Sequence, residues 1–70
     1  MIRLKVKEVA NAKGISQGKL ARKADIDIKT LQRIYRHPTS VITTETLAKL
    51  AEALGVSSSD LIEDIPDVST

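Results

Sequence analysis

The sequence predicts an all-α domain built as a compact five-helix bundle, and two observations carry this prediction. Five helix-compatible stretches follow one another within the first 64 residues, separated by short connections. Each stretch begins after a capping Ser, Thr or Asp, or ends at a Gly or Pro, the residues that start and stop helices. In a chain of 70 residues we expect a single domain at 1–64 and a short flexible tail at 65–70.

The first helix is expected over about 5–13 and ends at Gly14, which suits the position after a C-cap. Its apolar face carries Val6, Val9 and Ala10. The second helix is expected over about 17–24, after Ser16 as a favourable N-cap. Its inner face carries Leu20, Ala21 and Ala24.

A third helix is expected over about 28–36. The segment 25–27 separates it from the second helix, and Asp27 caps its N-terminus. Pro38 stops it, because the residue before a proline avoids the helical conformation. Its apolar residues lie one helical turn apart, at Leu31 and Ile34. A loop from His37 to Ile42 follows.

Thr43 caps a fourth helix over about 44–54, which Gly55 closes. Apolar residues recur in it at helical spacing, at Leu47, Leu50, Ala51 and Leu54. The segment 57–60 (Ser-Ser-Ser-Asp) resembles a capping box with Asp in the Glu position. It predicts a fifth, short helix that reaches about Asp64.

Two short stretches depart from the helical pattern. Residues 2–6 (Ile-Arg-Leu-Lys-Val) alternate apolar and basic side chains, which favours a short N-terminal extended segment. Val41 and Ile42 form an apolar pair within the loop after the third helix. The two stretches could pair as a small two-stranded ribbon, either within one chain or between two chains.

The net charge of +2 conceals a strong asymmetry along the chain. Residues 1–36 carry ten Lys and Arg against three acidic residues, a net charge of +7. Residues 37–70 carry one Lys against six acidic residues, a net charge of −5. A strongly basic half attracts polyanions, of which nucleic acid is the commonest in a cytoplasm. Lysines scattered over an ordinary solvated surface are the alternative explanation.

Composition argues against several other classes of protein. The chain has no cysteine for a disulfide or a thiolate metal site, and Tyr35 is its only aromatic residue, too few for a sheet that stacks RNA bases. His37, the only histidine, has no partner at catalytic or metal-ligand spacing, and the serines at 57–59 are explained by capping. We therefore expect no enzyme, no metal and no cofactor. Because no transmembrane span or export signal is apparent, we expect a cytoplasmic protein without a membrane partner.

Residues 17–36 read as helix, three-residue turn and helix, a helix-turn-helix unit. Once its apolar residues are assigned to the core, the third helix keeps an outward face of Ile28, Lys29, Gln32, Arg33 and Arg36. In the major groove Arg or Lys can bind guanine, Gln adenine, and an aliphatic group the thymine methyl. An ordinary solvated face would mix charges, yet no acidic residue occurs between Asp27 and Glu45. The pattern therefore favours DNA readout.

In these residues the chain resembles the lambda-repressor-like (XRE/Cro-type) helix-turn-helix proteins of bacteria and phages. The resemblance covers about Lys5 to Ile62. It rests on Gly14-Ile15-Ser16-Gln17, Leu20-Ala21, Ile26, Leu31, Ile34, Thr46-Leu47 and Leu50-Ala51-Glu52-Ala53-Leu54-Gly55-Val56-Ser57. It implies a five-helix fold in which the second and third helices form the helix-turn-helix and the third enters the major groove.

The resemblance also implies roles for the residues at matching positions. Bases would be read by Ile28, Lys29, Gln32 and Arg33, with Asp27 nearby. Phosphates would be bound by Gln17, Thr30, Arg36, His37, Thr39 and Ser40. The N-terminal amides of the second helix would assist, since helix N-termini favour anions.

Two positions depart from the family pattern. Asp25 stands where the turn usually has glycine, and we expect the turn to form at modest cost because aspartate tolerates left-handed geometry better than most residues. Many members bury an Arg–Glu pair where this chain has Tyr35 and Ala10. There we expect an aromatic ring packed against a small residue, with the tyrosine hydroxyl reaching the surface, in preference to a DNA contact.

The sequence thus predicts a sequence-specific DNA-binding transcriptional regulator, a repressor or antitoxin-like autoregulator, associated with the nucleoid of a bacterium or phage. One recognition helix buries too little surface for high affinity, so a homodimer on a pseudo-palindromic site is expected. Four apolar residues either form part of the dimer contact or cover the core: Leu61, Ile62, Ile65 and Val68. A signal would have to come from a protein partner, from proteolysis or from abundance. The alternative function is a protein-interaction module on the same fold, an antirepressor or antitoxin-like partner that binds an acidic protein.

Overall fold

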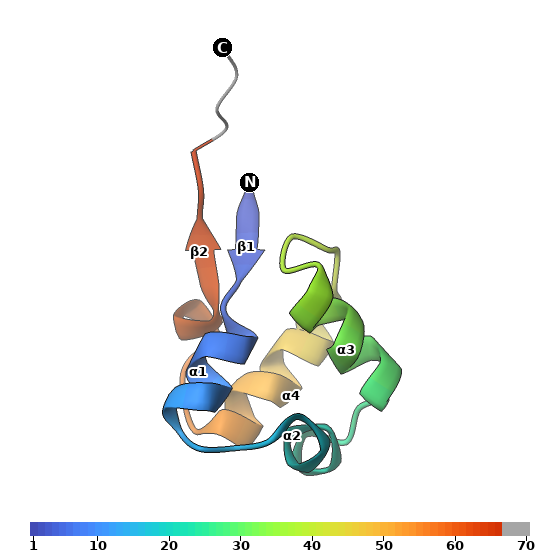
Figure 1. Cartoon of the computed structure of the whole chain (residues 1–70). Helices are drawn as coiled ribbons and strands as arrows, with labels where there is room; N and C mark the ends of the chain where they lie inside the picture. Colours follow the sequence, from blue (N-terminus) through green and yellow to red (C-terminus); the bar gives the residue numbers. More distant parts are fainter. Residues whose placement is uncertain (67–70) are drawn as a thin grey trace.

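Four α-helices enclose one apolar cluster, and a two-stranded ribbon closes one end of it, within the residues 1–66 that the computed structural model describes (Figure 1). The elements in order are β1 (Ile2–Leu4), α1 (Val6–Ala12), α2 (Gln17–Ala24), α3 (Ile28–Arg36), α4 (Thr44–Leu54), the 3₁₀ helix η1 (Ser58–Leu61) and β2 (Ile62–Asp64). The predicted helical class is confirmed, and the four α-helices begin and end within one residue of their predicted bounds.

The predicted fifth α-helix is wrong. The expected capping box does form: the Asp60 carboxylate accepts hydrogen bonds from the backbone N–H of Ser57 (3.2 Å) and from its hydroxyl (3.0 Å). The chain then makes only one 3₁₀ turn, and Ile62 is already extended (φ −125°, ψ 149°). An isolated helix this short is unstable in water, and pairing with β1 gives the same backbone groups better partners.

The ribbon joins the two ends of the described chain. β1 and β2 pair antiparallel, with Ile2, Arg3 and Leu4 opposite Asp64, Glu63 and Ile62. Met1 and Ile65 extend the pairing by exchanging two backbone hydrogen bonds (2.8 and 3.1 Å). The N-terminal extended segment is thereby confirmed, but its predicted pairing with Val41-Ile42 within one chain is wrong, because β2 takes that place. Among the described residues, one backbone hydrogen bond joins the loop to β1: the Leu4 N–H donates to the Pro38 carbonyl (2.6 Å).

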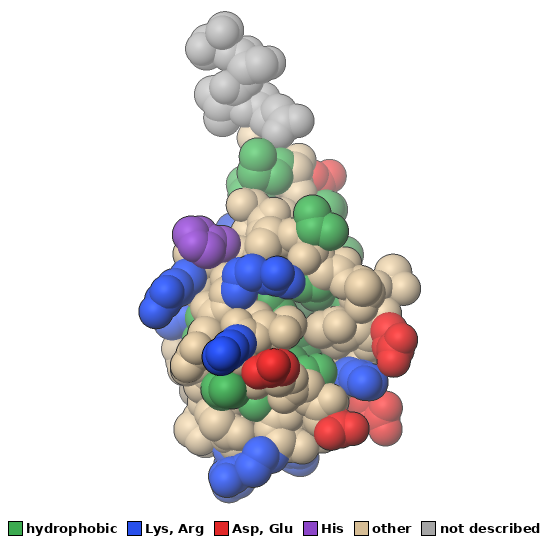
Figure 2. Space-filling view, turned by 90° about the vertical axis from the view of Figure 1, so that its right-hand side faces the viewer, with side chains coloured by type: hydrophobic (Ala, Val, Ile, Leu, Met, Phe, Trp, Pro, Cys, Tyr) green, Lys and Arg blue, Asp and Glu red, His purple; other side chains and the backbone are tan. Residues whose placement is uncertain are grey.

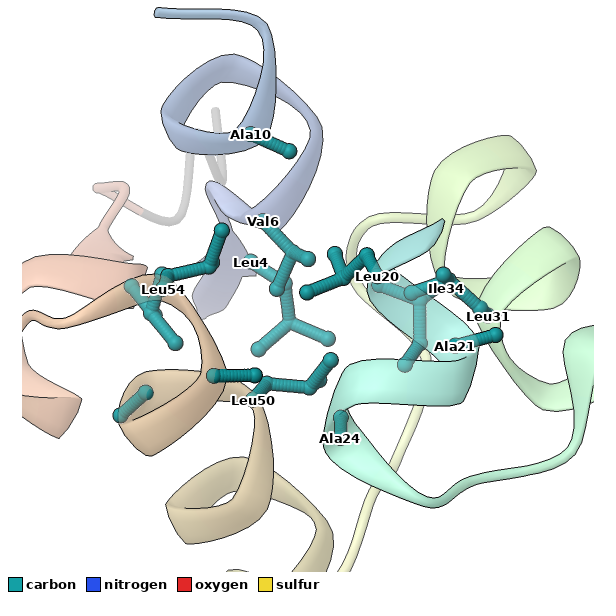
Figure 3. Close-up of a cluster of buried hydrophobic side chains, with 13 residues drawn as sticks. Leu4, Val6, Ala10, Leu20, Ala21, Ala24, Leu31, Ile34, Leu50 and Leu54 are labelled. Atoms are coloured by element: carbon teal, nitrogen blue, oxygen red, sulfur yellow. The ribbon is translucent and has the colours of Figure 1, made fainter. Parts of the chain in front are cut away.

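The core receives side chains from every helix and from β1 (Figure 3). Its largest fully buried side chains are Leu20, Leu31, Ile34, Leu50, Leu61 and Val6. Burying one side chain of this size contributes about 1.5–3 kcal/mol to the free energy of unfolding, so a domain of 70 residues depends on each of them.

Two of the four C-terminal apolar residues, Leu61 and Ile62, contact the core. Leu61 is completely buried in the core, so it covers the core and is not available for a dimer contact. Ile62 and Ile65 are half-buried, and Ile62 packs against the core. Val68 lies outside the described residues.

Tyr35 differs from its prediction in one respect. Its ring packs against the core, as expected, and Ala10 on α1 is fully buried. The hydroxyl oxygen, however, is enclosed and has no hydrogen-bond partner within the described chain, so the prediction that it reaches the surface is wrong. Leu4 and Pro38 line the space around Tyr35, because their backbone hydrogen bond holds the start of the chain against the end of α3. Burial raises the pKa of the Tyr35 phenol.

Replacing Tyr35 with Phe should leave the free energy of unfolding unchanged or raise it by up to about 1 kcal/mol, since an enclosed hydroxyl without a partner is costly to desolvate. The variant should also change how the free energy of unfolding depends on pH in the alkaline range. The raised pKa of the phenol means that the folded protein holds its proton more tightly, so the wild type loses stability as the pH rises above the unfolded value of about 10. Urea denaturation at neutral and alkaline pH measures both effects. A Y35F variant that is clearly less stable at neutral pH would show that the hydroxyl has a partner.

Gly18 has no reason within the fold to be glycine. It lies inside α2 with helical backbone, and a Cβ at this position would meet nothing within 4 Å. Gly18→Ala should therefore raise the free energy of unfolding by up to about 1 kcal/mol. Gly55→Ala is the matched control, because Gly55 has a φ of 70° at the C-cap of α4 and its replacement should cost about 1 kcal/mol. Urea denaturation should show changes of opposite sign in the free energy of unfolding of the two variants.

Candidate nucleic-acid interface

Each helix of the helix-turn-helix begins at a side-chain cap, and the cap of α3 lies in the turn between the two helices. Ser16 Oγ accepts a hydrogen bond from the Lys19 N–H (3.3 Å), and Asp27 Oδ1 accepts one from the Lys29 N–H (2.9 Å). Between the two helices Asp25 adopts a left-handed backbone conformation (φ 56°, ψ 49°), as expected for the position where glycine is usual. The local signals in the sequence therefore form the turn as predicted.

Small side chains let α2 and α3 approach each other closely. Ala21 and Ala24 are buried on α2, and Leu31 and Ile34 are buried on α3. Ile26 anchors the turn between them: its N–H donates to the Ala21 carbonyl (3.0 Å), and its half-buried side chain packs against the core. With its apolar side fixed in this way, α3 presents its opposite side to solvent.

The four residues expected to read bases all lie on this outer side. They are Ile28, Lys29, Gln32 and Arg33, and each is exposed. Within residues 1–66 their side chains make no hydrogen bond and no ion pair. Figure 2 shows this face, on which Lys and Arg side chains gather together with the histidine. The geometry leaves the face open to a ligand.

Three acidic side chains from the second half of the chain, Glu45, Glu63 and Asp64, form ion pairs away from α3. Glu45 lies 3.6 Å from the Lys49 ammonium within α4, and the Glu63 carboxylate accepts a hydrogen bond from Arg3 (3.2 Å). On α3 itself the nearest acidic residue in sequence is Asp27, whose Oδ1 is engaged as the helix cap. Among the described residues, no ion pair joins a carboxylate to Lys29, Arg33 or Arg36 on the outer face of α3.

The six residues expected to bind phosphates surround α3 and the start of α2. Arg36, His37 and Thr39 are exposed, whereas Gln17, Thr30 and Ser40 are half-buried. Ser40 closes the turn after α3, since its hydroxyl and its backbone N–H (2.9 Å) both donate to the His37 carbonyl. In this conformation Ser40 has no proton left to donate to a phosphate oxygen, which sets it apart from the other five.

One surface feature next to Arg33 was missed in the sequence. A shallow groove of about 280 Å³ runs between α3 and the start of α4, lined by Thr30, Arg33, Val41, Ile42, Thr43 and Thr46. Val41, one of the residues that line it, is 87% exposed. The only signal for this was an apolar residue in a polar loop, which by itself does not show whether a side chain is buried or exposed.

Two other kinds of site are absent from residues 1–66. No group of three or more His, Cys, Asp or Glu side chains in this part of the chain could hold a metal ion. No helix in the same range is long and apolar enough to span a bilayer.

The chain was also compared with known proteins. We found no curated protein that matches it. A family model, however, matches residues 5–67, which include the whole helix-turn-helix and the exposed face of α3. The family is described as the Cro/C1-type HTH DNA-binding domain, in agreement with the resemblance noted in the sequence. The chain therefore belongs to the Cro/C1-type helix-turn-helix DNA-binding domain family.

Proposed function

We propose that the protein is a transcriptional regulator, a repressor or antitoxin-like autoregulator, that binds double-stranded DNA by inserting α3 into the major groove. The observation that carries this proposal is the outer face of α3, where an aliphatic side chain and three hydrogen-bond donors are exposed and without partners in the described chain. Such donors match the acceptors on the edges of bases in the major groove. Occupying an operator is enough to exclude polymerase, so repression needs no second activity.

Each side chain on this face has a specific chemical partner on DNA. Arg33 and Lys29 can donate to guanine O6 and N7, and Gln32 can form the two-bond contact with adenine N6 and N7. Ile28, 38% exposed at the first position of α3, suits contact with a thymine methyl. These four residues are proposed to set the operator sequence.

Phosphate contacts would position α3 without specifying sequence. At the start of α2 the Lys19 N–H is bonded to the Ser16 hydroxyl and the Leu20 N–H to the Ser16 carbonyl. The amides of Gln17 and Gly18, in the first turn of the helix, have no intrahelical acceptor, and a helix N-terminus attracts an anion. At the other end of the face, Arg36, His37 and Thr39 would bind the backbone across the groove, with Thr30 between the two sets.

DNA binding is expected to weaken steeply as salt rises, because phosphate contacts release counterions. Fluorescence anisotropy with labelled genomic fragments at increasing salt measures this, and selection from a random duplex library identifies the operator. Absence of binding even at low salt would contradict the proposal and favour a protein-interaction module that uses the same basic face to bind an acidic protein.

Two arginines on α3 should respond differently to removal. Arg33→Ala should weaken binding to the selected operator by about 1–3 kcal/mol and relax the preference at one base pair. Arg36→Ala should weaken binding to all sequences alike and reduce the salt slope by about 1. Both side chains are exposed, so each variant serves as the other's folding and charge control. Equal effects of the two variants on sequence preference would contradict the proposed division of roles.

A further inference from the structure

Val41 is the most exposed large hydrophobic residue in the described part of the chain, with 87% of its side chain open to solvent. Its neighbour Ile42 is half-buried and packs against the core. Val41 contributes almost no surface to that core, so the fold gives no reason for an apolar side chain at this position. A ligand that covers the side chain would give such a reason.

The backbone on both sides of Val41 is fixed. Before it, the Ser40 N–H donates to the His37 carbonyl (2.9 Å), and the Ser40 hydroxyl donates to the same atom. After it, Thr43 caps α4, because its Oγ1 accepts a hydrogen bond from the Thr46 N–H (3.1 Å). Valine is branched at Cβ and has few rotamers. A ligand that packs against Val41 therefore pays little free energy for ordering it.

Val41 lies at the border of the proposed DNA-binding face. It lines the shallow groove between α3 and α4 together with Thr30 and Arg33. It also lines a second groove, at the ribbon end, together with Thr39 and Ser40. In Figure 2 hydrophobic side chains lie next to the Lys, Arg and His side chains of this face. A DNA strand that is bound both by Arg33 and by the loop after α3 therefore passes beside Val41.

The polar groups around Val41 suit the phosphates of such a strand. The Thr30 hydroxyl makes no hydrogen bond within residues 1–66, so it can donate to a phosphate oxygen. The Thr46 hydroxyl accepts a hydrogen bond from Thr43 Oγ1 (2.9 Å) and keeps its own proton to donate. Between successive phosphates of a DNA strand lies a deoxyribose, whose C–H groups need no hydrogen-bond partner. An apolar side chain set among donors matches that alternation of sugar and phosphate.

We propose that Val41 packs against a deoxyribose of the DNA backbone and is a positioning residue for α3 in the major groove. The inference rests on the proposed function and adds to it an apolar contact with the backbone. Sugar contacts carry no sequence information, so Val41 contributes affinity and orientation but no base preference. A second copy fits this position less well, because a twofold contact at Val41 would place the unpaired Arg33 of both copies near each other.

Val41→Ala tests the contact without disturbing the core, and urea denaturation should show an unchanged free energy of unfolding. Fluorescence anisotropy should show that V41A binds a duplex with a single half-site about fivefold more weakly, because less apolar surface is buried against the sugar. The factor should be the same for every sequence. The salt slope should stay that of the wild type, in contrast to Arg36→Ala, because no phosphate contact is lost. Val41→Ile should bind at least as tightly as the wild type.

Ile2→Ala is the matched control. It shortens another exposed aliphatic side chain, one that lines the groove at the ribbon end but not the groove beside Arg33. It should bind the single half-site like the wild type. In the complex of the wild type with this duplex, intermolecular NOEs are expected from the Val41 methyls to deoxyribose protons.

Four results would overturn the proposal: wild-type affinity in V41A, an equal loss in I2A, a loss confined to one base pair with NOEs to a thymine methyl, and a loss that appears only on duplexes with two half-sites. The last result would assign Val41 to a contact between copies. A wild type that binds the half-site with the same affinity as V41A refutes the sugar contact and leaves the proposed function intact. A wild type that binds no duplex even at low salt refutes both.

Discussion

The burial of Leu31 and Ile34 against α2 is the constraint on which the rest of the molecule depends. These two side chains are the fully buried residues of α3, and they lie one turn apart on a helix of nine residues. Together they set the rotation of α3 about its own axis. Every other residue of the helix then points to a direction that follows from helical geometry alone. Ile28, Lys29, Gln32 and Arg33 reach solvent for this reason, and not because each is hydrophilic.

The molecule has two kinds of surface, which differ in whether their cations are paired with carboxylates. On α3 the cations have no acidic partner in the described chain, so they remain available to an anion. At the ribbon the cations are paired with Glu8, Glu63 and Asp64, so that end is close to neutral and keeps its apolar side chains exposed. The same basic half of the sequence thus provides one surface on α3 whose cations are unpaired in the described chain, and another at the ribbon whose cations are paired with carboxylates. The Met1–Ile65 pairing accounts for this difference, because it brings acidic residues from the far end of the chain next to the cations of β1.

The pairing of β1 with β2 also closes the small core at one end. A domain of this size buries a limited share of its surface, and Leu4 and Leu61 are buried on either side of the point where the two strands meet the helices. Closing the core has an energetic cost at Tyr35. Its hydroxyl is enclosed without a partner in the described chain, beside Leu4 and Pro38, which are joined by their backbone hydrogen bond. The stability gained by closing the core is greater than the loss of one hydrogen bond to water.

Local chemistry in the sequence determined the four α-helices, their caps and the identity of the exposed face of α3. Ser16, Asp27 and Thr43 act within three residues of themselves, and apolar periodicity acts within a helix, so no knowledge of distant contacts was needed. Tertiary structure alone decided the partner of β1, the extension of the chain after Leu61, the enclosed Tyr35 hydroxyl and the gathering of exposed apolar side chains beside the ribbon. Each of these joins residues that are far apart in the chain, and the free energy of such pairings depends on what else lies near them in space. A pattern of neighbouring residues in the sequence does not specify that environment.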